Sequence, residues 1–275
     1  MKIGIIGKGF VGNAILQGLN HYYDLKVHDI DPRRSTNTFE EVVNCDLVFL
    51  CVPTPMHKDT GECDLSYIES VFEKAGKISI SCIFVIKSTV PVGTTKKLNE
   101  KYKNIKILHS PEFLTARTAA TDFICPSRHI VGGETENGTD ILKQIYEERF
   151  PGVPCQTMTS DESEFVKYFA NCFFATKVSY FNEMAVFARA HNLDWNKVIQ
   201  GVMSDGRIGI SHYQVPGFDG SFGFGGTCFP KDINALIKSL EEVGANPVVL
   251  KAAWERNLLV RDNKDWEQSK SAVST

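Results

Sequence analysis

The stretch IGIIGKGFVGNAIL, residues 3–16, decides which fold we expect. Gly7, Gly9 and Gly12 form a G-x-G-x-x-G pattern, which follows an apolar run typical of a strand and opens a segment typical of a helix. Gly7 permits a tight turn, Gly9 lets the backbone approach a pyrophosphate, and Gly12 lets the helix pack closely on the strand. The N-terminus of the helix would then face the negative charge of a bound dinucleotide.

An acidic residue at the end of the second apolar run strengthens this interpretation. Asp29 follows the glycines by about twenty residues, a spacing that suits a carboxylate binding the ribose diol of NAD. An acid at this place would repel the extra phosphate of NADP. Phe10, Val11 and Arg34 complete the cofactor contacts that we expect, although Arg33 and Arg34 also suit a solvated surface.

Short apolar runs alternate with helix-like stretches over residues 1–157. The runs occupy residues 2–6, 25–29, 47–52, 82–87, 105–108, 128–133 and 153–158. Continuous apolar strands separated by amphipathic helices predict a parallel sheet that is covered on both faces. We therefore expect an α/β fold in which a Rossmann-type, doubly wound parallel sheet forms an NAD-binding domain over residues 1–157.

A different pattern starts near residue 158. Apolar residues then recur with helical spacing over about thirty residues, and Asp161 with Glu164 fits a capping box at the start of this helix. We expect a mostly α-helical second domain over residues 158–262, which contains this long central helix, and a polar tail over 263–275 that frays. Helices of such length commonly cross between domains or build a dimer core, so we expect a homodimer.

Composition and charge exclude several classes of protein. The net charge is −3 and there is no long block of Lys and Arg, so we expect no nucleic-acid partner. No segment approaches the ~20 apolar residues of a membrane span, so we expect no membrane association. The cysteines are scattered and the N-terminus lacks a signal peptide, which predicts free thiols in a cytoplasmic protein. We expect no bound metal.

Polar residues follow the third and fourth apolar runs at the predicted carboxyl edge of the sheet. They are Thr54 with Pro55, and Ser88 with Thr89. Ligands of doubly wound folds bind at this edge, so we expect these residues to contact the cofactor. The alternative is a structural role, because Ser, Thr and Pro commonly cap helices and turns.

The run SFGFGGTCFPKD, residues 221–232, places Cys228 between a glycine-rich loop and Pro230, a residue that suits the first turn of a helix. A thiol beside free backbone N–H groups and the positive end of a helix dipole has a lowered pKa, and its thiolate is a nucleophile near neutral pH. The glycines would let a bulky ligand approach the backbone. The alternative is a small buried cysteine beside a tight turn.

Further polar residues suit catalysis, and each has an alternative role. Lys167 and Asn171 lie four residues apart on the long helix and share a face, which a solvated stripe would also explain. Glu112 follows the fifth run, where it would activate water or stabilise a helix N-terminus. Asp232, four residues after Cys228, would orient a water or the lysine, or balance the helix dipole.

In combination these motifs resemble the UDP-glucose dehydrogenase family (UDP-glucose/GDP-mannose dehydrogenases) from residue 1 to roughly 262. The supporting stretches are GKGFVG, KSTVPVGTT, SPEFL, PSRHIVGG, EFVKYFANCFFATKVSYFNE, DGRIG and GFGGTCFPKD. The resemblance implies an NAD-dependent oxidation that converts the primary alcohol of a nucleotide sugar to a carboxylate in two steps. UDP-glucose is the leading substrate that it implies.

The resemblance also implies a role for each site residue. Cys228 would form a thiohemiacetal and then a thioester, Lys167 and Asn171 would stabilise oxyanions, and Asp232 would assist proton transfer. Glu112 would activate water for hydrolysis of the thioester, and Thr89 would position that water. The implied substrate contacts are Glu112, Phe113, Leu114, Lys167, Asn171, Arg207, Phe224 and Gly225.

The sequence departs from the family pattern at two places. The family commonly has a second glutamate four residues after the first, where this sequence has Ala116. Relatives also carry a third α/β domain that helps to bind the nucleotide, and this chain stops near where it would begin, so we expect either a natural compact form without that domain or a fragment. GDP-mannose and UDP-N-acetylhexosamines therefore stay open as substrates.

Two other functions stay open. A 3-hydroxyacid-type dehydrogenase also pairs a Rossmann domain with a helical domain and uses a Lys-x-x-x-Asn face, but it needs one NAD per product and no thiol. A non-catalytic relative would bind NAD and turn nothing over. The presence of Cys228, Lys167, Asn171 and Asp232 argues against the second alternative.

Overall fold

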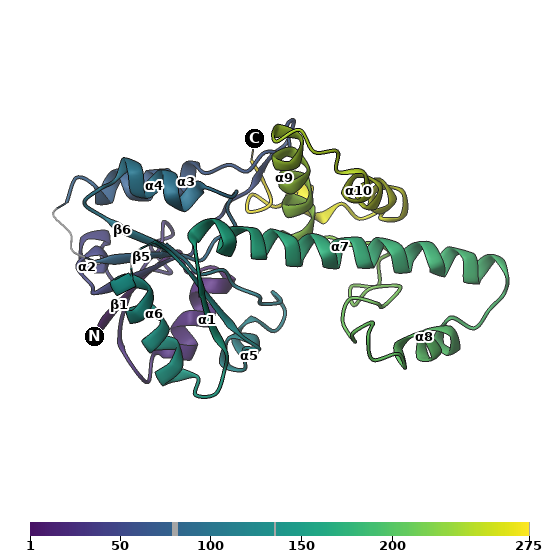
Figure 1. Ribbon diagram of the computed structural model, residues 1–275, viewed down its shortest axis with the longest axis horizontal. Coiled ribbons are helices and arrows are strands. Elements are labelled where there is room, and N and C mark those ends of the chain that lie inside the picture. The colour runs from purple at the N-terminus through teal and green to yellow at the C-terminus, as the bar shows by residue number, and fades with distance from the viewer. Residues whose placement is uncertain (79–81, 135, 275) are drawn as a thin grey trace. The chain divides into compact units, whose positions relative to one another are not determined.

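The computed structural model describes residues 1–78, 82–134 and 136–274 (Figure 1). The chain forms two compact units. Unit 1 consists of Met1–Thr54 and Leu65–Lys167, and unit 2 consists of Pro55–Asp64 and Tyr168–Thr275. In the described ranges no helix combines the length and the apolar character that a bilayer span requires.

Unit 1 contains a seven-stranded sheet in which β1 is the second strand from one edge. Its strands are β1 (Lys2–Ile6), β2 (Asp24–His28), β3 (Leu47–Leu50), β5 (Ile83–Ile86), β6 (Lys106–His109), β7 (His129–Gly132) and β8 (Cys155–Met158). The order in the sheet is β2-β1-β3-β5-β6-β7-β8, so the strand order reverses beside β1, as in a doubly wound fold. Each predicted apolar run forms one of these strands, and the predicted Rossmann-type α/β fold is confirmed.

The direction of two strands differs from the prediction of a parallel sheet. β6 pairs with β7 in the antiparallel direction, whereas β7 and β8 are parallel to each other. The sheet is therefore mostly parallel. A strand that is buried on both faces shows the same continuous apolar run in either direction, so the sequence pattern does not encode this reversal.

Helices cover both faces of the sheet (Figure 1). They are α1 (Phe10–Leu19), α2 (Phe39–Val43), α3 (Ser66–Ala75), α4 (Thr94–Lys101), α5 (Ala119–Ile124) and α6 (Glu136–Arg149). Leu47 and Phe49 of β3 lie in one core with α1, α5 and α6, and the alternate residues Val48 and Leu50 lie in a second core with α2, α3 and α4. Burial of each such side chain stabilises the fold by about 1.5–3 kcal/mol.

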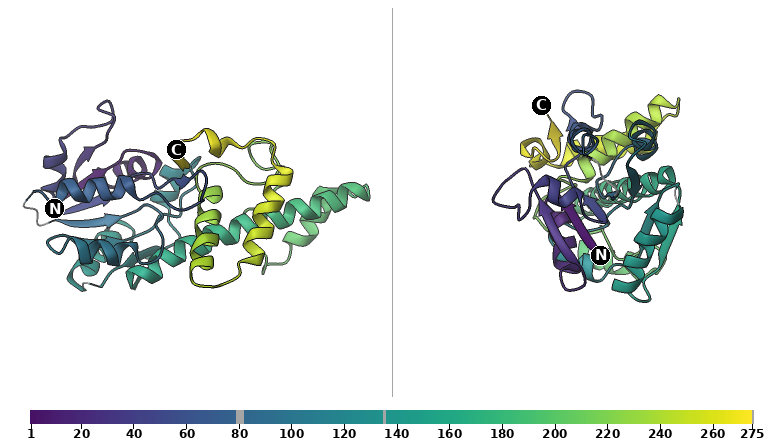
Figure 2. Two further views of the ribbon diagram at one scale, coloured as in Figure 1. Left: turned by 90° about the horizontal axis from the view of Figure 1, so that it is seen from above. Right: turned by 90° about the vertical axis from the view of Figure 1, so that its left-hand side faces the viewer.

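Unit 2 is mostly α-helical, as predicted. Helix α7 (Ser160–Ala190) begins in unit 1 and continues into unit 2, and its 31 residues form one continuous helix about 46 Å long (Figure 2). Helices α8 (Trp195–Met203), α9 (Phe229–Glu242) and α10 (Val248–Val260) follow. Side chains of α7, α9 and α10 form the core of unit 2 around Tyr168, Phe224 and Ile233.

The start of α7 differs from the predicted capping box of Asp161 and Glu164. Thr159 and Glu162 form the box instead: Thr159 N donates to Glu162 Oε2 at 2.8 Å, and Glu162 N donates to Thr159 Oγ1 at 3.3 Å. The buried Glu164 carboxylate accepts hydrogen bonds from backbone N–H groups at the start of α4. Glu164 therefore stabilises the N-terminus of a different helix, which sequence spacing alone does not reveal.

The predicted fraying of the polar tail is wrong for its described residues, and residue 275 lies outside them. Trp266, in a short 3-10 helix (Asp265–Gln268), is 2 % exposed. Strand β9 (Val273–Ser274) pairs in parallel with β4 (Met56–His57). One buried tryptophan and this strand pair hold a segment that is polar in composition, because a buried indole removes a large apolar area from water.

Candidate active site

The glycine pattern has the conformation that a dinucleotide loop requires. Gly7 has a φ of +90°, and a Cβ on it would lie 2.6 Å from the Cys51 carbonyl oxygen. A Cβ on Gly12 would collide with the Gly7 carbonyl. Gly9 is the N-cap of α1, no described side chain caps this end, and a Cβ on Gly9 would meet nothing within 4 Å. These uncapped N–H groups beside open space fit the pyrophosphate of NAD.

Asp29 lies against the glycine loop. Its Oδ2 accepts a hydrogen bond from Lys8 N at 2.6 Å, and its Oδ1 accepts one from Asp31 N at 2.9 Å. Arg33 and Arg34 are largely exposed and lie 2.8 Å and 3.7 Å from the Asp31 carboxylate. Hydrogen bonds from Arg33 lower the pKa of Asp31 to about 2. The two arginines are thus paired on the surface in this structure.

The polar residues at the ends of β3 and β5 are bonded to backbone. The Thr54 hydroxyl donates to the Thr89 carbonyl at 2.7 Å, and the Ser88 hydroxyl donates to the Val52 carbonyl at 2.6 Å. These bonds connect the ends of the two strands. Thr54 and Ser88 therefore have a structural role of the kind named above as the alternative to cofactor binding. Pro55 begins the segment that belongs to unit 2.

Glu112 and Lys167 form an ion pair in unit 1. Glu112 Oε1 lies 3.0 Å from Lys167 Nζ, and Glu112 Oε2 accepts a hydrogen bond from Leu114 N at 2.6 Å. Burial alone would raise the pKa of Glu112, but the Lys167 ammonium, the Leu114 N–H and the charge of Lys87 hold it below its ordinary value. Glu112 is therefore an anion at neutral pH.

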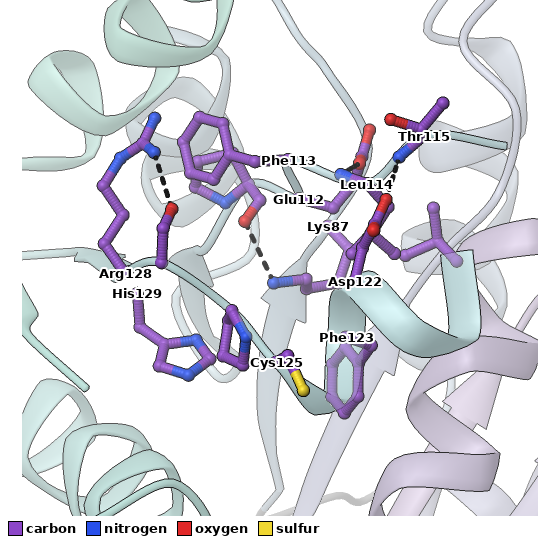
Figure 3. A pocket seen from close by; sticks show the side chains of 14 residues that line it. Lys87, Glu112, Phe113, Leu114, Thr115, Asp122, Phe123, Cys125, Arg128 and His129 are labelled. Atoms are coloured by element: carbon purple, nitrogen blue, oxygen red, sulfur yellow. Dashed lines mark hydrogen bonds between the residues drawn. The ribbon is translucent and has the colours of Figure 1, made fainter. Parts of the chain in front are cut away.

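A pocket of about 280 Å³ lies beside this ion pair (Figure 3). Lys87 is in its wall and donates to Ser110 Oγ, the Pro111 carbonyl and Tyr146 OH at 3.1–3.2 Å. These acceptors are neutral, and within the described part of the chain the ammonium forms no ion pair. Because Pro111 directly precedes Glu112, Lys87 holds the backbone that carries the candidate base.

The other walls of the pocket are mixed, because apolar and cationic side chains line it together with the carboxylate of Asp122. Leu114 and Val11 line it, and Arg128 lies 3.9 Å from the centre of the Phe113 ring (Figure 3). Phe10, by contrast, is largely exposed. The apolar and cationic part of this lining suits a ring-shaped ligand that carries negative charge nearby.

Unit 2 presents Cys228 at the start of a helix. Cys228 is the N-cap of α9, Pro230 lies in the first turn, and no described side chain caps this end. All eight cysteines are free of disulfides, as predicted. Burial raises the pKa of Cys63 to about 11 and that of Cys51 to about 12, so these two thiols stay protonated at neutral pH. The N-terminal position of Cys228 is one that stabilises a thiolate.

Asp232 lies one turn after Cys228 and is buried. Its Oδ2 accepts a hydrogen bond from Asn171 Nδ2 at 2.6 Å, and its Oδ1 pairs with Lys231 Nζ. Burial alone would lower the pKa of Lys231, but the Asp232 carboxylate raises it well above the ordinary value. Unit 2 thus brings Cys228, Asp232 and Asn171 together. Lys167 lies one helical turn before Asn171 on α7.

Two of the glycines before Cys228 lie against side chains of this chain itself. Phe224 N donates to Asn257 Oδ1 at 2.7 Å, and Asn257 Nδ2 donates back to the Phe224 carbonyl at 3.0 Å. A Cβ on Gly223 would collide with Asn257, and a Cβ on Gly225 would collide with Arg261. The loop therefore needs glycine because its own helix α10 approaches the backbone. The Phe224 ring is buried in the core of unit 2.

Arg207 lies apart from these clusters. Its guanidinium is about 90 % exposed and pairs with Asp205 two residues earlier. The structure thus pairs this predicted substrate contact with Asp205 on the surface.

Comparison with known proteins identifies the family. A model described as the NAD-binding domain of the UDP-glucose/GDP-mannose dehydrogenase family matches residues 17–150, and the model of the central domain of that family matches residues 161–258. A UDP-glucose 6-dehydrogenase of Campylobacter jejuni is 33 % identical over 292 residues, which cover 94 % of this chain and 72 % of that protein. The chain belongs to the UDP-glucose/GDP-mannose dehydrogenase family. It is therefore an oxidoreductase, and the prediction of NAD as its cofactor is confirmed.

Solved structures agree with this family. The UDP-glucose dehydrogenase of Pyrobaculum islandicum matches with a TM-score of 0.84 and 28 % identity over 94 % of this chain and 68 % of that one. The 3-hydroxyisobutyrate dehydrogenase of Mycobacterium tuberculosis matches with a TM-score of 0.73 over 96 % of this chain and 95 % of that one. Its 18 % identity shows that the fold is shared and nothing further.

Several residues that lie in or beside the candidate site of this chain were not predicted from the sequence. Lys87 is the last residue of the run CIFVIK, and a charged residue at the end of a buried strand is a pattern that could have indicated a functional role. Lys231 adjoins Asp232 in the quoted motif. Asn257, Arg261 and Asp265 gave no signal, because their contacts with the glycine loop are long-range and lie outside any motif.

Proposed function

We propose that this chain catalyses the NAD-dependent, two-step oxidation of the primary alcohol of a nucleotide sugar to a carboxylate, with UDP-glucose as the first candidate. The observation that carries the proposal is the Cys228 thiol at the N-terminus of α9, one turn before a buried Asp232 that bonds Asn171 and Lys231. A one-step dehydrogenase has no use for a nucleophilic thiol there. The C. jejuni relative, a UDP-glucose 6-dehydrogenase, supports the substrate class.

The chemistry divides between the two oxidations and a hydrolysis. Bound NAD supplies the hydride acceptor for each oxidation. The Cys228 thiolate adds to the aldehyde carbon formed in the first oxidation, and the resulting thiohemiacetal is oxidised to a thioester. Attack of water on the thioester carbonyl expels the thiolate and releases the carboxylate. One alcohol, two NAD⁺ and one water give one carboxylate, two NADH and three protons.

The remaining residues have distinct roles in this proposal. Asn171 and Lys167 donate hydrogen bonds to the oxygen on the reacting carbon as it becomes negative. Asp232 takes part in proton transfer through water. Glu112, an anion at neutral pH, accepts the proton of the water that attacks the thioester, which Thr89 helps to position. The backbone at Gly7–Gly12 and the Asp29 carboxylate hold NAD.

The yield of NADH per sugar tests the proposal. We expect two NADH per carboxylate with one member of a panel of UDP-glucose, GDP-mannose and UDP-N-acetylhexosamines. Cys228→Ala should abolish carboxylate formation and leave NAD affinity unchanged, whereas Cys155→Ala, which removes a thiol of β8 outside the pocket, should change neither. One NADH per product, together with a fully active Cys228→Ala variant, would establish the one-step alternative. Binding of NAD without turnover of any sugar would establish the non-catalytic one.

A second copy of this chain is the partner that we propose for α7. Phe173, Tyr180 and Phe187 are each more than half exposed and recur every seven residues, so they share one face of the helix. Three exposed aromatic rings in a row on one helix support association with an identical helix of a second copy, because their burial would remove a large apolar area from water.

A further inference from the structure

The segment after α10 contacts the glycine loop that precedes Cys228. Gly226 N donates a hydrogen bond to both carboxylate oxygens of Asp265, at 3.2 Å and 3.0 Å. Gly226 lies two residues before Cys228, and its φ is +73°. The backbone conformation immediately ahead of the thiol is therefore held by a side chain that lies 39 residues later in the sequence.

Arg261 extends this contact to the other side of the loop. Its guanidinium, 2 % exposed, pairs with Asp265 at 3.2 Å and with Asp219 at 2.8 Å. It also donates to the Phe222 carbonyl at 3.4 Å. Asp265 and Arg261 together bond both flanks of the loop, so the loop is clamped between them.

The glycine at position 225 is explained by the same clamp. A Cβ there would collide with the Arg261 guanidinium and with the Asp265 carboxylate. The loop can pack against these two side chains because it has no side chain at this point. Sequence reasoning assigned this close approach to a ligand, and the structure assigns it to Asp265 and Arg261.

Asp265 is itself held on a packed element. It opens the short helix that carries the buried Trp266, and the Trp266 ring lies 5.6 Å from the Trp254 ring, centre to centre. Trp254 in turn lies 6.1 Å from the Phe224 ring inside the loop. The pairing of β9 with β4 fixes the end of the segment. The Asp265 carboxylate can therefore hold Gly226 in place, whereas a side chain on a frayed tail could not.

We infer that Asp265 is a positioning residue for the Cys228 thiol. It fixes the Gly226 backbone, and with it the direction in which the thiol leaves the start of α9. The inference rests on the proposed function of Cys228 as nucleophile. It concerns residues 261–274, which lie beyond the match to the central-domain model at residue 258.

Asp265→Ala tests the contact directly, with Asp262→Ala, an exposed aspartate in the same segment, as the matched control. Hydrogen–deuterium exchange of the Gly226 amide should become about tenfold faster in Asp265→Ala and stay unchanged in Asp262→Ala. Alkylation of Cys228 by iodoacetamide, measured against the exposed Cys125, should change by about threefold or more in Asp265→Ala alone. Neither measurement needs a substrate.

Kinetic measurements distinguish a role of Asp265 in positioning the thiol from a role in stabilising the fold as a whole. With the sugar accepted by the wild type, Asp265→Ala should lower kcat for carboxylate formation about tenfold or more and leave the NAD affinity unchanged. Asp265→Asn should recover most of kcat, because its amide oxygen can still accept from Gly226 N. Loss of kcat and of NAD affinity together, without recovery in Asp265→Asn, would mean that Asp265 supports the fold alone and would overturn the inference.

The outcomes separate this inference from the proposed function. If the wild type oxidises no nucleotide sugar, the proposed function fails, while exchange at Gly226 and alkylation of Cys228 still decide whether Asp265 positions the thiol. If Asp265→Ala and Asp262→Ala give equal exchange, the inference fails whatever the substrate. Faster exchange with unchanged alkylation and unchanged kcat also overturns it, because the thiol is then placed by other contacts.

Discussion

The Glu112 carboxylate lies 3.0 Å from the Lys167 ammonium, and the two side chains are 12 % and 3 % exposed. An ion pair so deeply buried is costly to break, because the remaining charge stays out of water. Burial opposes ionisation of Glu112, and the neighbouring ammonium more than compensates for it. The stability of unit 1 should therefore depend on the charge of this one carboxyl.

Glu112→Gln should lower the free energy of unfolding by about 3 kcal/mol at neutral pH. Because the pKa of Glu112 is lowered below its ordinary value of 4.5, the ion pair stabilises the fold above pH 4.5 and loses this effect as the pH falls through the folded-state pKa. Urea denaturation at pH 7 and near pH 3.5 should show that the wild type has a higher free energy of unfolding than Glu112→Gln, and that this difference is smaller in acid. The same difference at both pH values would exclude the ion pair as its cause. The exposed Glu255→Gln variant should change stability at neither pH.

Lys87→Met should move the acid limb of the pH–rate profile for carboxylate release to higher pH. Removal of this charge raises the pKa of Glu112, so the base is protonated at a higher pH than in the wild type. In the wild type, burial and the charge of Lys87 lower the pKa of His129 to about 3, and burial raises the pKa of Cys51 to about 12, so neither group titrates where the carboxyl base does. The profile would be measured by carboxylate assay between pH 4 and 9, roughly the range over which a carboxyl base and its neighbours titrate.

A uniform loss of rate at every pH would instead mean that Lys87 acts through the fold alone. The exposed Lys106→Met variant removes a lysine from the same sheet and should leave the profile unchanged.

Asp29→Ala should weaken NAD binding about tenfold in isothermal titration, because it removes the charged acceptor that we propose for the ribose and that accepts a hydrogen bond from Lys8 N. Asp31→Ala removes an acid two residues away that is already paired with Arg33, and it should leave the affinity unchanged. Equal affinities in the two variants would contradict the assignment of Asp29 to the cofactor.

Gly225→Ala should destabilise unit 2 by about 1–3 kcal/mol, as expected when a methyl group is forced into a well-packed site. The new Cβ would collide with Arg261 and Asp265. Gly206→Ala is the control, since a Cβ there would meet nothing within 4 Å. Thermal unfolding of the two variants should differ by several degrees, and equal melting temperatures would show that the loop relaxes freely around the methyl group.

Tyr180→Glu should convert the proposed homodimer into a monomer in light scattering coupled to gel filtration. A carboxylate at the centre of the seven-residue repeat of Phe173, Tyr180 and Phe187 would have to be buried without a partner. Tyr67→Glu, which changes an exposed tyrosine of unit 1, should leave the mass unchanged. A wild-type monomer at micromolar concentration would rule out this interface.

The features that the sequence predicted correctly are those that depend on residues close together in the chain. Each apolar run became a strand within about two residues of its predicted bounds. For β3, β5 and β7 the reason is that a strand buried on both faces must be continuously apolar. The glycines at 7 and 12 and the acid at 29 were predictable because a dinucleotide loop leaves few other choices. Cys228 at a helix start followed from Pro230.

The unpredicted part depends on contacts between distant residues. Glu164 reaches the start of α4, and Asn257 and Asp265 reach the glycine loop, yet each is a single polar residue without a local partner pattern. The two-residue strands β4 and β9 are too short to show a period. The reversed direction of β7 left no trace in its composition.

The pairing of Met56 with Val273 constrains how the polypeptide is made and handled. The Ser274 hydroxyl donates a hydrogen bond to the Met56 carbonyl although the two residues are 218 positions apart, so the ribosome must synthesise all of the intervening residues before β4 pairs with β9. Until then the early hairpin at Pro55–Asp64 waits with an unpaired edge, open to chaperones or to other nascent chains.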